Sequence, residues 1–296
     1  MAFVPEKHTD PQGNRRYSEI HWSDFWWNLQ DSGDIPEGAT IVPVLLAIDE
    51  THLNIIGHTK VHPVYLTIGN IPKRERRTYS KHAYVIIAYL PALEGSGSEQ
   101  KTPNYAEAKN RLYHTSLSHL LESIKNAGIH GRMMKGPDGM YRNCFPVIMS
   151  IAADYPEACH IGLVRQGSNC LVCMAKKKDF PNLVKKHKLR TVPAMKKVLN
   201  TVQKAIANGK NVEGELELQR NGLIGMQNSL WDLPHVNMYN IFTPDVLHQI
   251  KKGVWEHIIT WFKHLVHSRY SAQHKAHGIL AEFDARISMI PHFPEL

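Results

Sequence analysis

The sequence predicts an α/β protein with a mixed sheet, built in the order strand, strand, strand, helix, strand. Apolar runs of strand length occur at three places within the first 90 residues. A longer segment with apolar residues at helical spacing follows, and then a fourth apolar run. The first and fourth runs both end on an aspartate. The predicted arrangement is therefore of the type β-β-β-α-β.

The first run, Ile41 to Ile48, has seven apolar residues in eight positions, which is the length that a buried strand needs. It ends at Asp49, with Glu50 beside it. A carboxylate at the end of a buried strand is held rigidly while its oxygens face solvent. Mg²⁺ takes one or two such carboxylates and keeps its other positions for water or phosphate. The alternative is that Asp49 caps the following turn.

The other core elements are, in chain order, a strand at 61–72, a cationic turn at 73–77, a strand at 82–90, a helix at 104–127 that Gly128 is expected to end, and a strand at 145–153. The last strand ends on Asp154, which is 105 residues after Asp49 (154 − 49). The ribonuclease H-like fold has this order and places its fourth strand next to its first. Asp49 and Asp154 are then expected to form a metal-binding pair, because adjacent carboxylates repel unless a cation lies between them.

Composition limits the class of protein. The 296 residues are 43% hydrophobic and 21% charged, which is typical of a globular chain. No apolar run approaches the roughly 20 residues of a membrane span, and MAFVPEKHTD at the start lacks the apolar core of a secretory signal. The formal net charge of +8 favours a polyanionic partner.

Cys170 and Cys173 form a C-x-x-C knuckle, which is half of the ligand set that a structural Zn²⁺ needs. His187 is a candidate third ligand. Cys159, His160 or a more distant histidine are candidates for the fourth. The alternative is a pair of small buried thiols in a turn.

A strongly basic run follows the knuckle. Between Lys176 and Lys210 there are eleven Lys or Arg residues and one acid, Asp179. Such a run is usually a solvated helix face, but beside a zinc knuckle it favours a surface that follows DNA phosphates. The residues predicted to bind nucleic acid are Lys176, Lys177, Lys178, Lys185, Lys186, Lys188 and Arg190.

Four segments are predicted from these patterns. They are an N-terminal arm at 1–40, the first part of the catalytic core at 41–160, an inserted C-x-x-C and basic helical segment at 161–240, and a helical segment at 241–296. The arm carries aromatic residues at helical spacing near Trp26, with Ser23 or Asp24 near the N-cap. Residues 208–240 have little periodicity and are predicted to be a connection.

The last segment contains a long amphipathic helix. Thr243 is a suitable N-cap and Pro244 suits the first turn. Asp245 and His248 are three residues apart, so both point the same way from the first turn. The alternatives are that Asp245 only caps the helix and that His248 is a surface imidazole.

Taken together, several motifs resemble the fungal Plavaka-type DNA transposases of the CACTA-like group. The matching stretches are collinear and cover most of the chain. They are DFWWNLQ, GATIVPVLLAIDETHL, VHPVYLTIGNIPKRERR, FPVIMSIAADYPEA, CLVC with KKHKLRT, TPDVLHQIKKGVWEHIITW and FDARISMIPHFPEL. The resemblance implies a cut-and-paste transposase with a ribonuclease H-like core that uses Mg²⁺ or Mn²⁺, binds DNA and acts in the nucleus. Self-association is a further expectation.

By this resemblance Asp49 is the first catalytic acid and Asp154 the second. Asp245 and His248 match a D-x-x-H element that precedes the third acid in several transposase groups. The C-x-x-C and the downstream His187 fall where the family carries them, and so imply structural Zn²⁺.

Two departures from the family shape the expected activity. The third acid is expected beyond PHFPEL, and the nearby acids Glu256, Glu282 and Asp284 have no matching context. The resemblance also implies an additional N-terminal region that contributes to DNA binding, whereas this sequence starts almost directly at the core. A truncated and catalytically incomplete core is therefore expected. The alternatives are a non-enzymatic, zinc-stabilised module that binds DNA or protein, and a chain made unstable by open strand edges.

Overall fold

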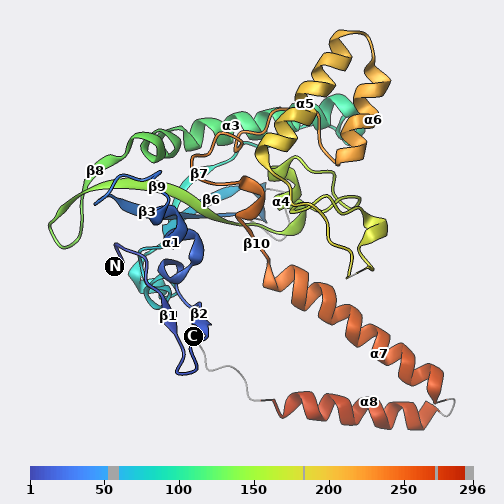
Figure 1. The fold of residues 1–296 in the computed structure, drawn as a ribbon. Helices are drawn as coiled ribbons and strands as arrows, with labels where there is room; N and C mark the ends of the chain where they lie inside the picture. The colour runs from blue at the N-terminus through green and yellow to red at the C-terminus, as the bar shows by residue number, and fades with distance from the viewer. Residues whose placement is uncertain (53–59, 183, 271–272, 291–296) are drawn as a thin grey trace. The chain divides into compact units, whose positions relative to one another are not determined.

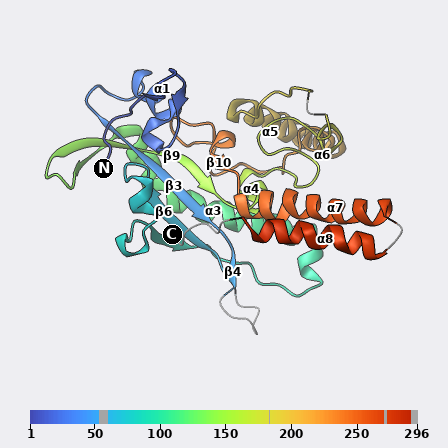
Figure 2. The same ribbon diagram turned by 90° about the horizontal axis from the view of Figure 1, so that it is seen from below.

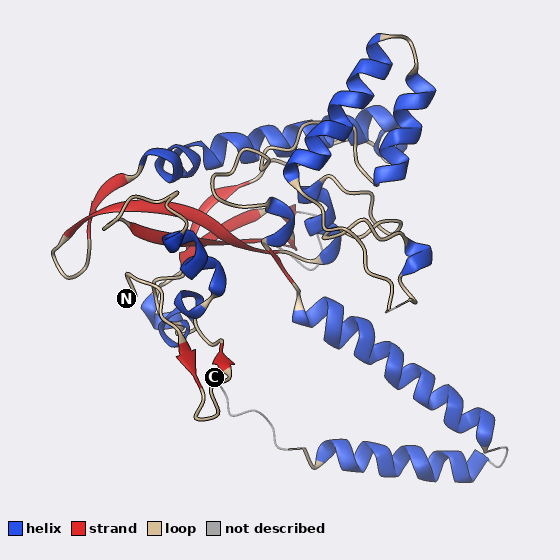
Figure 3. Ribbon diagram, in the orientation of Figure 1, coloured by secondary structure: helices blue, strands red, loops and turns tan. Residues whose placement is uncertain are grey.

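The computed structural model describes residues 1–52, 60–182, 184–270 and 273–290. The chain divides into two compact units, residues 1–244 and 245–296. In the described residues the first unit combines helices with strands, while the second is helical (Figure 3). The division into four segments at 40, 160 and 240 stays a prediction.

A mixed sheet of six strands forms the centre of the first unit (Figure 1). Five strands lie in the order β10-β9-β3-β6-β7, and β8 pairs with β9. β3, β9 and β10 are mutually parallel, whereas β6, β7 and β8 are antiparallel to their neighbours. The strands are β3 (Thr40–Ile48), β6 (Pro63–Ile68), β7 (Val85–Tyr89), β8 (Arg132–Lys135), β9 (Tyr141–Ala152) and β10 (Phe242–Thr243). The predicted α/β class with a mixed sheet is confirmed.

The first and fourth predicted strands lie side by side. β3 and β9 pair from Thr40 opposite Cys144 to Ala47 opposite Ala152, with one register shift after Val44. Both strands are parallel, so their carboxyl ends lie at the same edge of the sheet. β9 is longer than predicted because it begins at Tyr141 and forms a hairpin with β8 across the turn at Gly139, whose φ is +81°.

Helices cover both faces of this sheet (Figures 1 and 2). The long helix α3 (Pro103–His130) packs Leu117 and Leu121 into one core cluster with Val44, Leu46 and Ile48. On the other face, α1 (Asp24–Asp31) packs Trp26 and Leu29 against Ile41, Phe145 and Val147. Alternate residues of one strand point to opposite faces, so β3 contributes to both clusters.

The helix α3 extends beyond its predicted end. It begins where Thr102 accepts a hydrogen bond from the Tyr105 amide at 3.2 Å, and it ends at Gly131, whose φ is +70°. Gly128 was expected to stop the helix. Gly128 lies inside the helix instead. A Cβ at this position would come within 2.7 Å of the Pro146 carbonyl oxygen. This glycine permits close packing of helix on strand rather than a chain reversal.

The edge strand β7 and the N-terminal arm complete the first unit around the sheet. Val85 and Ile86 of β7 are about half exposed, at 53% and 48%. In the arm, Ser23 accepts from the Trp26 amide at 3.2 Å, which caps α1 as predicted. Four two-residue strands and a short helix form local turns: β1 (His8–Thr9), β2 (Arg15–Arg16), β4 (Thr51–His52), β5 (Lys60–Val61) and α2 (Lys73–Arg76).

In the described residues, three α-helices lie between β9 and β10. They are α4 (Tyr155–Gly162), α5 (Val192–Ala207) and α6 (Asn211–Asn221). The prediction of an irregular connection at 208–240 missed α6. The apolar face of α6 is narrow. The helix packs on α5 at Gly214, where an added Cβ would lie 3.5 Å from a Val202 methyl carbon. Such a contact is set by the partner helix rather than by local periodicity.

The second unit is helical in its described residues. A π-helical segment η6 (Val246–Trp255) continues into α7 (Glu256–Arg269), and α8 (Gln273–Ser288) packs on α7 through Phe262 and Phe283. The predicted N-cap at Thr243 was wrong, because Thr243 lies in β10 and pairs there with Ala152 of β9. The motif PHFPEL, residues 291–296, lies outside the described residues. No helix in the described part of the chain is long and apolar enough to cross a membrane.

Candidate metal and nucleic-acid site

The predicted pair of acids follows directly from the register of β3 and β9. The last paired residues are Ala47 and Ala152, and Asp49 and Asp154 each come two residues later. Adjacent strands lie roughly 4.8 Å apart, so the register brings the backbones at Asp49 and Asp154 to neighbouring positions at one edge. Figure 2 shows β3 and β9 side by side in this sheet.

Asp154 also begins a helix. Its Oδ1 accepts a hydrogen bond from the Glu157 amide at 2.7 Å, so it is the N-cap of α4. The side chain is half-buried, and its Oδ2 has no hydrogen-bond partner among the described residues. One carboxylate oxygen thus fixes the helix while the other stays available, and a carboxylate is the ligand type that hard cations prefer.

A largely buried cluster of polar side chains lies behind this edge. Glu157 of α4 accepts a hydrogen bond from the Tyr113 hydroxyl, which comes from α3. Its Oε1 lies 3.0 Å from the His62 Nε2, in an ion-pair contact rather than an aligned hydrogen bond. His160, one turn along α4, lies 3.9 Å from the other oxygen. The Glu157 carboxylate thereby joins α3, α4 and the chain leading into β6.

Burial opposes the ionisation of Glu157, but the contacts from His160, His62 and Tyr113 outweigh it and lower the Glu157 pKa to about 2. Burial, together with the Glu157 charge, raises the pKa of Tyr113 well above its usual value. Burial lowers the pKa of the neighbouring His114 to about 4. At neutral pH the cluster therefore holds one carboxylate, a neutral phenol and a neutral His114.

The cysteine knuckle is held by backbone contacts. The Cys170 amide bonds to the Ala175 carbonyl at 2.9 Å, and Cys173 forms an isolated bridge with Leu189. The Cys170 and Cys173 thiols lie close enough to interact, and burial raises the pKa of Cys173. Burial also raises the pKa of Cys159, which lies close enough to interact with Cys170.

The fit of this region to zinc is partial. Two neighbouring thiols provide soft ligands, and the Nε2 of His187 is buried without a hydrogen-bond partner in the described chain. However, among the described residues no three His, Cys, Asp or Glu side chains converge into a group that could hold a metal ion. The structure therefore brings the two cysteines together but does not join His187 to them.

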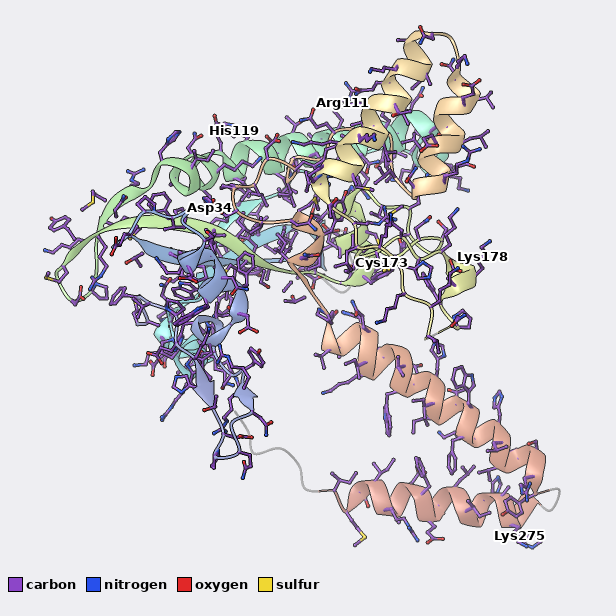
Figure 4. All side chains as sticks on the ribbon, viewed as in Figure 1. Asp34, Arg111, His119, Cys173, Lys178 and Lys275 are labelled. Carbon is purple, nitrogen blue, oxygen red and sulfur yellow. The ribbon has the colours of Figure 1, made fainter. Side chains whose placement is uncertain are left out.

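The basic run is largely a solvent-facing surface. Lys177, Lys178, Lys186 and Lys188 are exposed, and Figure 4 shows Lys178 on a short helical turn beyond the loop that carries Cys173. Lys185 is exposed too but pairs with Asp179 at 2.6 Å, and Lys176 is half-buried.

Arg190 requires a correction. It is fully buried, and its guanidinium donates to the carbonyls of Cys170 and Asn221 at 2.9 and 2.7 Å. A side chain in this position braces the knuckle against the end of α6 and offers no charge to a nucleic acid.

Asp245 and His248 lie in the second unit and contact each other. The Asp245 Oδ1 accepts from the amides of Leu247 and His248, and its Oδ2 contacts the His248 Nδ1. The hydrogen bond with His248 lowers the pKa of Asp245. The carboxylate thus caps the π-helical segment and also orients the imidazole, so both alternatives from the sequence apply in part.

A comparison with protein families gives one match, to the Plavaka transposase model, over residues 1–262. The chain belongs to the Plavaka transposase family. No curated protein matches it. In this Plavaka-family chain, the matched residues include the two strand-end acids, the knuckle, the basic run and the Asp245–His248 pair.

The sequence did not reveal the cluster around Glu157. One signal was present, because Asp154 and Glu157 have the spacing of a capping box at a helix start. The other members, His62 and Tyr113, lie 95 and 44 residues from Glu157 (157 − 62 and 157 − 113). Only the packing of α3 and α4 on the Plavaka-family sheet brings them together.

Proposed function

We propose that this chain forms a ribonuclease H-like transposase core in which Asp49 and Asp154 bind Mg²⁺ or Mn²⁺. The reaction would be hydrolysis of a DNA phosphodiester by an activated water, followed by attack of the freed 3′-hydroxyl on a second DNA. The observation that carries the proposal is the register of β3 and β9, which brings two aspartates to one sheet edge in a member of a transposase family.

The donor set suits this chemistry. Two carboxylates on neighbouring parallel strands offer hard oxygen ligands, and cations held there would stabilise the charge on the attacking and leaving oxygens. No third acidic or histidine ligand joins them within the described residues. We propose that Asp245 and His248 act as a D-x-x-H pair within the second unit, with Asp245 orienting the imidazole. With two protein ligands, the affinity for metal is expected to be weak.

DNA is the proposed substrate, and the nucleus is the proposed place of action. The exposed lysines Lys177, Lys178, Lys186 and Lys188 would follow the phosphate backbone without reading sequence. A Zn²⁺ held by Cys170 and Cys173 would stiffen the segment that carries them. His187 would have to move toward the thiols to join them as a third ligand.

The test is nicking and strand transfer on a supercoiled plasmid in Mg²⁺ or Mn²⁺. Wild type is compared with Asp49→Ala, Asp154→Ala and the control Asp34→Ala, which removes an exposed acid of the N-terminal arm (Figure 4). Metal-dependent nicking by wild type and the control, with at least a hundredfold loss in the other two variants, would establish the catalytic function.

A second candidate is a DNA-binding module without catalysis, favoured by the exposed lysines and by the lack of a third metal ligand among the described residues. No nicking by wild type, together with salt-sensitive DNA binding that Asp49→Ala and Asp154→Ala retain, would establish this second function. Nicking that survives both substitutions would disprove the role of the acid pair.

A further inference from the structure

The cationic turn between β6 and β7 is not used by the proposed reaction. From Lys73 to Lys81 it contains five Lys or Arg residues and one acid, Glu75. The turn comes shortly after Gly69, whose amide donates a hydrogen bond to the Pro43 carbonyl. The turn therefore lies near the start of β3. About 26 Å of strand, eight residues from Ile41 to Asp49 at roughly 3.3 Å each, separates this end of the sheet from the acids.

Three of these cations have local partners. The Lys73 ammonium bonds to the Ser18 hydroxyl at 3.0 Å, and the Arg76 guanidinium lies 3.9 Å from Glu19. Lys81 pairs with Glu75 at 3.4 Å. The first two contacts tie the turn to the N-terminal arm, which runs beside it in Figure 1. The turn is thus held in place at its base.

The other two cations, Arg74 and Arg77, are exposed and have no ion pair within the described residues. Tyr79 lies between Arg77 and Lys81 in the sequence and is 93% exposed. Solvation accounts for exposed guanidinium groups, but it does not favour an apolar ring left almost wholly in water. An exposed aromatic ring flanked by unpaired cations is the combination that binds single-stranded nucleic acid.

The backbone beyond Tyr79 is unusual as well. His82 has a φ of 47°, in the left-handed region that residues other than glycine rarely adopt. This conformation ends the turn and brings the His82 ring to 6.0 Å from the Tyr79 ring. Backbone strain of this kind gathers at binding sites, where the surrounding contacts maintain it.

We propose that the turn at residues 73–82 binds an unpaired segment of DNA. Arg74 and Arg77 contact the phosphates, and the Tyr79 ring stacks on a base. A duplex is disfavoured at this site, because its bases are already stacked and offer no face to the ring. The proposal rests on the proposed DNA function and adds a second contact surface at the opposite end of the sheet from Asp49 and Asp154.

The test measures the fluorescence anisotropy of a labelled 20-nucleotide single strand and of the same sequence as a duplex, with the full chain. Tyr79→Ala should weaken binding of the single strand roughly tenfold and change binding of the duplex by less than about twofold. Tyr79→Phe should bind like wild type, since phenylalanine retains a stacking ring. The matched control is Tyr141→Ala, which removes a tyrosine that is 67% exposed on the β8–β9 hairpin.

Substituting both Arg74 and Arg77 with Ala should make the negative slope of log K against log salt shallower by about 1.4, at about 0.7 per phosphate on single strands. The control Lys101→Ala/Lys109→Ala removes two exposed lysines elsewhere and should not lower it. If wild type binds DNA but both turn variants match it within twofold, or if Tyr79→Ala weakens the duplex equally, this inference is wrong while the proposed function stands. If wild type binds neither DNA, both fail.

Discussion

Two regions were predicted as metal sites, yet they are built in different ways. One is the acid edge, the end of the sheet where Asp49 follows β3 and Asp154 follows β9, and the other is the cysteine knuckle of Cys170 and Cys173. At the acid edge, eight register pairs between β3 and β9 set where Asp49 and Asp154 emerge. At the knuckle, isolated bridges such as Cys173 opposite Leu189 are the only pairing found in the described residues. A ladder fixes many positions together, so a motif at its end can be placed from the strand order. A motif in a loop indicates ligand types but not their convergence.

The Glu157 cluster gives the acid edge its stability, and removing it should have the largest effect. Glu157→Ala leaves His62 and Tyr113 buried without their partner, so we expect a loss of about 3–5 kcal/mol in the free energy of unfolding. Glu157→Gln keeps an acceptor for the Tyr113 hydroxyl and should cost less. Urea unfolding measures both. The control Glu213→Ala, at an exposed ion pair with Lys210, should stay within about 0.5 kcal/mol of wild type.

Acid should weaken the same region in two overlapping pH ranges. The His114 pKa falls from 6.5 to about 4, so the unfolded chain binds a proton first and stability is lost as pH falls between these values. This loss is about 3 kcal/mol for 2.5 pKa units. The lowered pKa of Glu157 adds a further loss between pH 4.5 and about 2. Unfolding curves from pH 7 to 2 measure both, and His114→Gln should remove only the upper one.

Arg190 tests whether the knuckle depends on a single brace. Arg190→Met keeps the length of the side chain but leaves the carbonyls of Cys170 and Asn221 without their donor. We expect a loss of about 2 kcal/mol, together with faster amide hydrogen exchange at residues 170–176 and unchanged exchange in β3 and β9. Equal acceleration in the sheet would show that the knuckle and the acid edge are one cooperative unit.

The smallest effect is expected at the knuckle thiols. Without zinc, Cys170→Ser/Cys173→Ser should change the free energy of unfolding by less than about 1 kcal/mol, because the backbone contacts of the loop remain. If zinc binds here, wild type should take up one equivalent and gain stability, while the double variant should do neither. Equal zinc uptake by both proteins would place the metal elsewhere and remove the knuckle from the comparison.

The errors of the sequence-based predictions share one cause. Gly128 was read as a helix stop, Arg190 as a surface cation and residues 208–240 as a connection, and each depends on a neighbour distant in sequence. Gly128 packs against the Pro146 carbonyl, Arg190 against Cys170 and Asn221, and α6 against α5. Local pattern has no access to such neighbours.

The sequence by itself determined the α/β class, the long helix, the Ser23 cap and the two aspartates that follow buried runs, because apolar periodicity and strand-end residues are local properties. The tertiary structure decided the rest. It placed β9 beside β3 in a register whose last pair, Ala47 and Ala152, precedes Asp49 and Asp154 by two residues each, and it gathered His62, Tyr113 and Glu157 into one largely buried cluster. It also buried Arg190 while leaving Tyr79 exposed. Burial and contact arise from what packs on a residue, and that is settled only when distant segments meet.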